Sequence, residues 1–291
     1  MESALEAPAV KGDAAYTRAH HAPARRAAAA GTVLLENDGL LPLAASGRIG
    51  LIGAFAEAPR YQGAGSSQVN PTRIDTALAT IRARVGTSAE LVYAPGYDPR
   101  TGASSAAQLE EARAVASRAD VVVLMVGLPA SYESEGFDRD HLRLPEDMYA
   151  LANAVLTANP RTAVVLVNGA PVELGLAADP AAIVEAYLGG QAAGSAICDV
   201  LFGDAEPGGR LAESIPFQAA DLPSDRTFAQ HPTQVRYLEG LNVGYRFHDT
   251  WDVAPRYCFG HGLSYTSFEW TQPRVAGPGT DVAVSVTVTN T

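Results

Sequence analysis

The stretch Val121-Val122-Val123-Leu124-Met125-Val126 is an uninterrupted apolar run with helix-like segments on both sides. A run of this kind predicts a strand that is buried on both faces, as at the centre of a parallel sheet. The polar segment Glu133-Ser134-Glu135-Gly136-Phe137-Asp138-Arg139 follows it. Open α/β sheets form their sites beyond the carboxyl ends of the strands. The acidic segment is therefore either a loop facing a saccharide or a solvated surface turn.

Strand and helix patterns alternate along the chain around this central run. Strands are expected at 31–36, 48–52, 91–93, 162–167 and 182–187, and helices at 17–30, 74–85, 106–118, 145–158 and 188–201. Pro23 is placed where it could open the first helix. The alternation predicts an α/β fold, a three-layer sandwich in which helices cover both faces of a mostly parallel sheet of about six strands.

Composition narrows the class of protein. The chain has 291 residues, 47% of them hydrophobic, which is enough for a full core. A net charge of -11 argues against a nucleic-acid partner, which needs a basic face. No stretch approaches the roughly 20 apolar residues of a membrane helix, and residues 1–26 lack an apolar signal segment. We therefore expect a soluble protein with no membrane partner and favour a cytoplasmic location. Cys198 and Cys258 are expected to be buried thiols, and a disulfide between them stays open.

The character of the sequence changes after Gly203. Residues 204–270 are rich in proline and aromatic residues, and we expect an irregular tail whose aromatic side chains pack onto the sheet. Residues 281–289 alternate apolar and polar side chains with period two. They predict one isolated strand, the start of a truncated β-sandwich, because a lone strand is not stable by itself.

A polar loop at residues 62–71 follows the second predicted strand and contains Gln62, Ser66 and Ser67. It resembles a phosphate-cradling glycine-rich loop, although it has neither a GxGxxG nor a P-loop pattern and no lysine follows it. A flavodoxin-like nucleotide site is therefore the least favoured interpretation. The loop can instead offer amide and hydroxyl groups to sugar hydroxyls or to another domain.

Several segments occur together in a characteristic order. They are Val33-Leu34-Leu35 with Leu40-Leu41-Pro42-Leu43, the loop at 63–71, Glu135-Gly136-Phe137-Asp138-Arg139 with Leu144-Pro145, Asp199-Val200-Leu201-Phe202-Gly203, Gly209-Arg210-Leu211, Val243-Gly244-Tyr245-Arg246 and Phe259-Gly260-His261-Gly262-Leu263-Ser264-Tyr265-Thr266. This ordered set resembles the carboxyl-terminal α/β-sandwich domain of glycoside hydrolase family 3, the β-glucosidase and β-xylosidase family. The resemblance covers about residues 19–270. It implies a leader or linker at 1–18 and the start of a fibronectin type III-like domain at 271–291.

The resemblance implies a retaining hydrolase of terminal β-linked glucosides or oligosaccharides, with no metal or organic cofactor. Such enzymes use two carboxylates roughly 5–5.5 Å apart, one as nucleophile and one as acid/base. Glu135 matches the family's acid/base, and Glu133 is its rival for that role. Asp138 and Arg139 are expected to fix the loop, the guanidinium gripping a carboxylate or carbonyl. Phe137, Gln62, Ser66 and Ser67 are further expected positioning residues.

The sequence departs from the family pattern at Glu36, where the family usually has lysine, and at Leu211-Ala212, where Leu-Pro is usual. The nucleophile motif is missing, and no TIM barrel fits before the first strand. The chain therefore needs a barrel in cis or in trans, and we expect it to be inactive alone. The alternative is a non-catalytic carbohydrate-binding or scaffold module, in which the loop at 62–70 and the aromatic tail hold a glycan or a partner.

Overall fold

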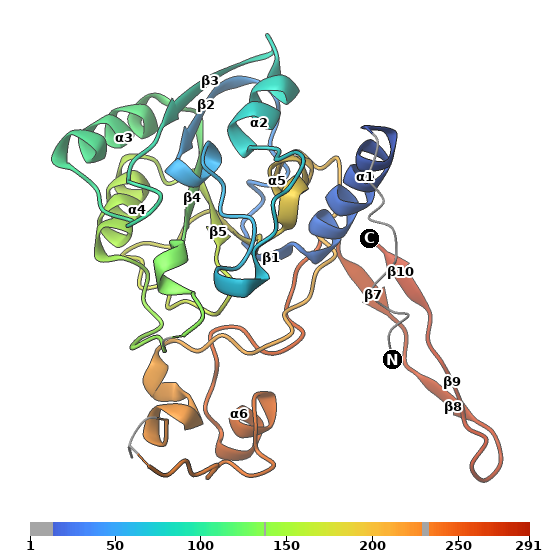
Figure 1. Cartoon of the computed structure of the whole chain (residues 1–291). Helices are drawn as coiled ribbons and strands as arrows, with labels where there is room; N and C mark the ends of the chain where they lie inside the picture. Colours follow the sequence, from blue (N-terminus) through green and yellow to red (C-terminus); the bar gives the residue numbers. More distant parts are fainter. Residues whose placement is uncertain (1–13, 137, 229–232) are drawn as a thin grey trace, which may run out of the picture.

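The computed structural model describes residues 14–136, 138–228 and 233–291 (Figure 1). A six-stranded sheet in the order β1-β6-β5-β4-β2-β3 runs through its centre. The strands are β1 Val33–Asn37, β2 Gly47–Ile52, β3 Ala89–Ala94, β4 Val121–Gly127, β5 Thr162–Val167 and β6 Ala182–Glu185. Strands β3, β2, β4, β5 and β6 are parallel, and β1 pairs antiparallel with β6. The predicted mostly parallel sheet is confirmed.

Helices cover both faces of this sheet. They are α1 Ala14–Gly31, α2 Ala77–Val85, α3 Ala106–Arg118, α4 Glu146–Ala158 and α5 Ala193–Leu201. Helices α3 and α4 contact each other, whereas α5 contacts α1 and α2. Figure 1 shows these two groups on opposite sides of the sheet, which gives the expected three layers.

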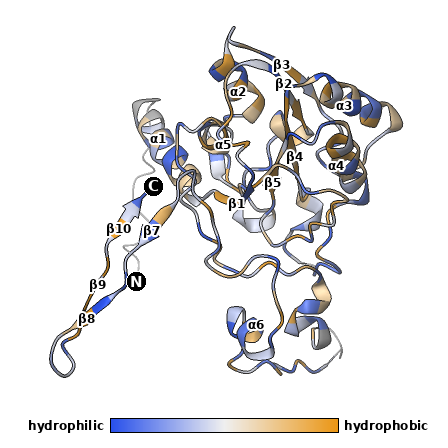
Figure 2. Ribbon diagram, turned by 180° about the vertical axis from the view of Figure 1, so that it is seen from behind, coloured by the Kyte–Doolittle hydropathy of each residue, from blue (hydrophilic) through white to orange (hydrophobic). Residues whose placement is uncertain are grey.

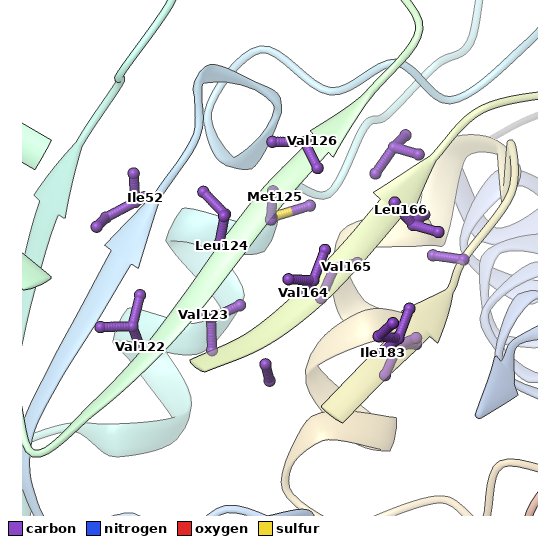
Figure 3. Packing of buried hydrophobic residues seen from close by; sticks show 14 of the residues in the cluster. Ile52, Val122, Val123, Leu124, Met125, Val126, Val164, Val165, Leu166 and Ile183 are labelled. Atoms are coloured by element: carbon purple, nitrogen blue, oxygen red, sulfur yellow. The ribbon is translucent and has the colours of Figure 1, made fainter. Parts of the chain in front are cut away.

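The core is built on the apolar run that decides the fold. Every residue of β4, β5 and β6 is buried, and Figure 3 shows side chains from these neighbouring strands together with Ile52 of β2. The sheet strands are correspondingly hydrophobic in Figure 2. Glycines lie just past β2 and at the end of β4, where backbones approach closely. A Cβ on Gly127 would lie 1.9 Å from the carbonyl oxygen of Val167, and one on Gly53 would lie 2.1 Å from that of Met125. The loops therefore leave the sheet edge close together.

Helix α1 differs from the prediction at its start. It begins at Ala14, so Pro23 lies inside the helix and residues 14–18 of the expected leader are helical. Residues 1–13 lie outside the described part of the chain. Tertiary contacts hold the turns on both sides of Pro23: the buried His21 ring lies 2.7 Å from a carboxylate oxygen of Asp75, and Arg25 pairs with Asp199. These contacts outweigh the unfavourable position of a proline within a helix.

The chain beyond α5 leaves the sheet and returns to it. Backbone hydrogen bonds join Ile215 and Tyr257 in both directions, at 2.9 and 3.1 Å. The described residues between them, 216–228 and 233–256, form an excursion that is held at both ends. It contains helix α6 Tyr245–Trp251, and Figure 1 shows α6 lying apart from the sheet. The exposed aromatic side chains of the excursion are Phe217, Phe228, Tyr237, Tyr245 and Trp251, and Phe259, Phe268 and Trp270 beyond it are also exposed. The expectation that the aromatic side chains pack onto the sheet is wrong for these residues. It is right for Tyr257, which is buried, and for Tyr265, which packs against the core.

The carboxyl-terminal segment is paired, contrary to the expected isolated strand. Its strands are β7 Phe268–Trp270, β8 Arg274–Ala276, β9 Ala283–Ser285 and β10 Val288–Asn290. Strand β10 pairs antiparallel with β7, and β9 pairs antiparallel with β8. The period-two pattern of 281–289 is thus divided between two short strands, each paired with residues that precede it. All four strands are exposed, so this pairing buries little apolar surface.

Short 3-10 helices complete the described secondary structure. They are η1 Ala54–Ala56, η2 Gly65–Ser67, η3 Ala130–Tyr132, η4 Gly190–Ala192, η5 Ala219–Asp221 and η6 Pro223–Arg226. Both cysteines are free; Cys198 is buried as expected, whereas Cys258 is exposed. None of the helices in the described residues has the length and apolar character that crossing a bilayer requires.

Candidate active site

Loops from four parallel strands surround a depression at the carboxyl edge of the sheet. Its volume is about 430 Å³, and it lies between the loops after β2, β4, β5 and β6. The residues that matter chemically in its wall are Arg60, Glu133, Glu135 and Arg139. The acidic segment after the central strand therefore lies at the sheet edge where its position in the sequence predicted a site.

Glu135 is exposed and held by a single neighbour from the loop after β2. Its two carboxylate oxygens accept hydrogen bonds from the backbone N–H and the hydroxyl of Ser66, each at 2.7 Å. The Ser66 hydroxyl and then its backbone N–H hold the pKa of Glu135 below its ordinary value. The sequence predicted both residues as site residues, and the structure brings them together.

The glycine-rich loop around Ser66 binds an anionic group of the same chain, the carboxylate of Glu135. Gly65 has a φ of 75°, and a Cβ there would lie 2.5 Å from a carboxylate oxygen of Glu135. Glycine is required because the backbone must both turn and approach the carboxylate. The donors that a phosphate would use are already occupied by Glu135, which argues against the nucleotide interpretation.

Glu133 lies at the centre of a different set of contacts. The buried Arg60 donates to one of its carboxylate oxygens at 2.6 Å, and the backbone N–H of Gly169 lies 3.0 Å from both oxygens. Arg60 also donates to the carbonyl of Leu128. Because these partners come from the loops after β2, β4 and β5, Glu133 ties three loops together. This geometry favours a positioning role for Glu133 over the acid role.

The other expected positioning residues support the loops in unequal ways. Arg139 donates to the carbonyl oxygen of Pro171 at 3.3 Å, which agrees with the expected grip on a carbonyl. Gln62 exchanges hydrogen bonds with the backbone of Val69, and Ser67 donates to the carbonyl of Ala64. Both side chains brace their own loop. Asp138 is exposed and lies beside the depression in an adjoining cavity, and Phe137 lies outside the described residues.

A buried carboxyl group lies at the end of β6, bonded to the loop after β5, and sequence reasoning missed it. Glu185, at the end of β6, is 1% exposed. It accepts hydrogen bonds from the side chain of Asn168 at 3.1 Å and the backbone N–H of Tyr187 at 3.0 Å. Burial raises the pKa of Glu185 to about 8. Sequence reasoning also missed Arg60, because no local pattern distinguishes a buried arginine in a loop from an exposed one.

The depression contains one exposed carboxylate, that of Glu135, which is bonded only by Ser66 among the described residues. Among the described residues that line the depression, only Glu133 and Glu135 carry carboxyl groups, and Glu133 is committed to Arg60 and Gly169. Retaining glycoside hydrolysis needs both a nucleophile and an acid/base on opposite sides of the scissile bond. The described residues that line the depression therefore provide Glu135 as their one exposed carboxylate and no second one.

Comparisons with known proteins point to one family. The sequence profile of the Glycosyl hydrolase family 3 C-terminal domain matches residues 32–265. Thermostable beta-glucosidase B of Acetivibrio thermocellus is 47% identical over 263 residues, which is 90% of this chain and 35% of that protein. An exo-alpha-(1->6)-L-arabinopyranosidase of Bifidobacterium longum is 42% identical over 94% of this chain and 37% of its own length.

Solved structures agree with this assignment. The crystal structure of a GH3 beta-glucosidase from Bifidobacterium adolescentis matches with a TM-score of 0.88 and 41% identity, over 94% of this chain and 40% of that one. DesR, a beta-glucosidase from Streptomyces venezuelae solved with D-glucose, matches with a TM-score of 0.86 and 27% identity, over 98% of this chain and 50% of that one. The chain spans only about a third of the length of the curated relatives named above.

Replacing Ser66 by alanine should raise the pKa of Glu135 toward its ordinary value, because both the hydroxyl donor and the loop geometry that supports the N–H donor are weakened. The measurement is a carboxyl-carbon NMR titration of the purified chain. Ser67→Ala is the matched control, since Ser67 donates to its own loop and should leave the titration unchanged. An unaltered pKa of Glu135 in Ser66→Ala would show that the hydrogen bonds from Ser66 to Glu135 do not form in solution.

Glu185→Gln should change how stability depends on pH. The pKa of Glu185 is about 8 in the folded chain, above the ordinary 4.5, so the folded state holds a proton that the unfolded state releases. Wild-type stability therefore falls as pH rises from about 4.5 to about 8, with a slope of up to about 1.4 kcal/mol per pH unit from this group. Relative to wild type, the variant should gain stability over that interval.

Urea unfolding at a series of pH values measures this difference, and subtracting the two curves cancels the other titrating groups. Exposed Glu269 supplies the control variant Glu269→Gln, which should follow the wild-type curve. If the free energies of unfolding of Glu185→Gln and wild type differed by a constant amount from pH 5 to pH 8, the raised pKa of Glu185 would be contradicted.

Proposed function

Since the chain belongs to the glycosyl hydrolase family 3 C-terminal domain family, we propose that it supplies the general acid/base of a retaining β-glucosidase and that Glu135 is that residue. The nucleophile, an aspartate, comes from a TIM-barrel domain in the same or another polypeptide. The substrate is a terminal β-linked glucoside or oligosaccharide. No metal or organic cofactor takes part.

The single observation that supports this proposal is the placement of Glu135. Its carboxylate is exposed in the depression at the carboxyl edge, whereas Glu133 beside it is held by a buried arginine and a backbone N–H. A general acid must reach the leaving oxygen of the substrate, and only the exposed carboxyl can do so. Glu135 also matches the acid/base position of the family pattern.

The protonation state of Glu135 argues that a second domain is needed. A general acid at neutral pH needs a raised pKa, but Ser66 lowers that of Glu135 while the depression is open to water. Closure against a barrel would remove water from the carboxyl group and bring the nucleophilic carboxylate near it. Both changes raise the pKa of an acid. We therefore expect the chain alone to lack both the nucleophile and a protonated acid.

Turnover of an aryl β-glucoside tests the proposal. The purified chain should show no turnover alone. Turnover should appear when the chain is mixed with the separately purified amino-terminal portion of thermostable beta-glucosidase B. Glu135→Gln should reduce the restored rate by at least about 100-fold, the usual contribution of general acid catalysis. Asp249→Asn, an exposed carboxyl on α6, is the control and should leave the rate unchanged.

Turnover by the isolated chain would reject the requirement for a barrel. Restored turnover that is insensitive to Glu135→Gln would reject the acid role. Saccharide affinity without turnover in the mixture would favour the non-catalytic carbohydrate-binding alternative.

An arabinopyranoside is a second candidate substrate. The similarity to two Bifidobacterium exo-alpha-(1->6)-L-arabinopyranosidases, at 42% and 41% identity over 94% of this chain, favours it. The proposed role of Glu135 is the same for both sugars, because either leaving oxygen needs a proton. An aryl α-L-arabinopyranoside in the same mixture distinguishes them by the ratio of kcat/KM values.

A further inference from the structure

Two walls of the depression are held by one buried side chain that has no part in the role proposed for Glu135. One wall contains Gly169 and Ala170, in the loop after β5, and another contains Leu188, in the loop after β6. Glu185 lies at the end of β6 and is bonded to both loops. It is not among the described residues that line the depression, so it acts on the site only through its neighbours.

The loop after β5 is held by the side chain of Asn168. Its amide donates to a carboxyl oxygen of Glu185 at 3.1 Å and to the carbonyl oxygen of Ala170 at 3.0 Å. The backbone N–H of the next residue, Gly169, lies 3.0 Å from both carboxylate oxygens of Glu133. Through one amide side chain, Glu185 therefore holds the turn whose N–H binds Glu133.

The loop after β6 begins with an unfavourable backbone conformation that Glu185 stabilises. Tyr187 has a φ of 51°, in the left-handed region that residues other than glycine rarely adopt. Its backbone N–H donates to the other carboxyl oxygen of Glu185 at 3.0 Å. Leu188 follows and lies close to the first loop, since a Cβ on Gly169 would be 3.1 Å from a methyl carbon of Leu188. Glu185 therefore holds two loops that meet in the wall of the depression.

The surroundings of Glu185 favour its uncharged form. The register of the sheet places Val33 of β1 and Leu166 of β5 opposite it, and neither can ionise. The ionisable groups that face Glu185 are Glu133 in the loop after β4, Glu213 in the segment after α5, and Tyr187 in its own loop. Burial, with a smaller contribution from these two carboxylates, raises the pKa of Glu185 to about 8.

We propose that Glu185 is a positioning residue: its uncharged carboxyl group holds the loops after β5 and β6 and thereby keeps Gly169 against Glu133. The loop that Glu133 anchors also carries Glu135, so Glu185 fixes the place of the acid without touching a substrate. This inference rests on the proposed function for what the loop does, but not for the contacts of Glu185. Ionisation of Glu185 adds a charge that repels Glu133, which weakens the contact with Gly169.

Two substitutions separate this positioning role from a general contribution to folding. Glu185→Gln resembles the uncharged acid, because its amide offers one acceptor and one donor group and cannot ionise. It should keep both loops in place. Glu185→Ala removes both hydrogen bonds and should release the loops. Glu269→Gln, which changes an exposed carboxyl on β7, is the control.

Methyl NMR of the full chain follows the loops without requiring turnover. The methyl signals of Leu188 and Ala170 should shift with a midpoint near pH 8 in wild type and in Glu269→Gln. In Glu185→Gln the same signals should not titrate near that pH. Glu213→Gln should move the midpoint to lower pH, because it removes a facing carboxylate that raises the pKa of Glu185.

Turnover in the barrel mixture measures the effect on the acid. At a pH of about 6.5, Glu185→Ala should lower kcat/KM by at least about ten-fold, whereas Glu185→Gln should stay within about three-fold of wild type, because small displacements of a catalytic group are costly. Rescue by glutamine but not by alanine is the result expected of a residue that acts through its uncharged form.

Three outcomes would overturn the inference: methyl signals of Leu188 and Ala170 that do not titrate near pH 8, signals that titrate equally in Glu185→Gln, or equal losses of kcat/KM in Glu185→Gln and Glu185→Ala. If Glu185→Ala does not fold, the titrations of Glu185→Gln and Glu213→Gln decide.

The positioning role and the acid role can fail separately. If the barrel mixture shows no turnover that depends on Glu135 while the Leu188 methyl signals still titrate with Glu185, the acid role is rejected. The hold of Glu185 on the two loops then stands.

Discussion

The ion pair between Arg60 and Glu133 is the contact on which the candidate site depends. The Arg60 side chain is 5% exposed and the Glu133 side chain 11%, so neither group is well solvated. Removing one partner of such a pair leaves an uncompensated charge, which typically costs about 3–5 kcal/mol. The pair, with the N–H of Gly169, holds the loop after β4 against those after β2 and β5. Glu135 lies two residues further along the same loop, so the ion pair of Arg60 and Glu133 also fixes the position of Glu135.

Around that anchor the edge of the sheet contains two carboxyl groups in opposite states. Glu185 is buried, and its pKa is raised to about 8, whereas Glu135 is exposed and its pKa is lowered by Ser66. The buried group fastens the loops after β5 and β6 through Asn168 and Tyr187. The exposed group is bonded by Ser66 and faces the depression. The environment of each group therefore decides its protonation state.

Sequence reasoning predicted the layers of the fold because local patterns and tertiary structure agree there. The apolar run at 121–126 is buried along its whole length, as its composition predicts. Ser105 and Gln108 form a capping box at the start of α3, where the pattern of the sequence predicts a helix to begin. The closeness of the loops that carry Ser66 and Glu135 could also be expected from the sequence, because the loops that follow parallel strands lie at the same edge of a sheet. The contacts of Arg60 and Glu185 depend on three-dimensional neighbours, which no spacing in the sequence reveals. The exposure of the aromatic excursion was missed because the bonds between Ile215 and Tyr257, which exclude it from the core, join residues far apart in sequence.

We propose that Glu135 stays ionised in this domain until a second domain covers it. The most direct test is the NMR titration of the Glu135 carboxyl carbon, in the chain alone and in complex with a family 3 barrel domain. We expect the pKa of Glu135 to lie below the ordinary glutamate value in the isolated chain and above it in the complex. A pKa of Glu135 that is the same in both states would contradict it.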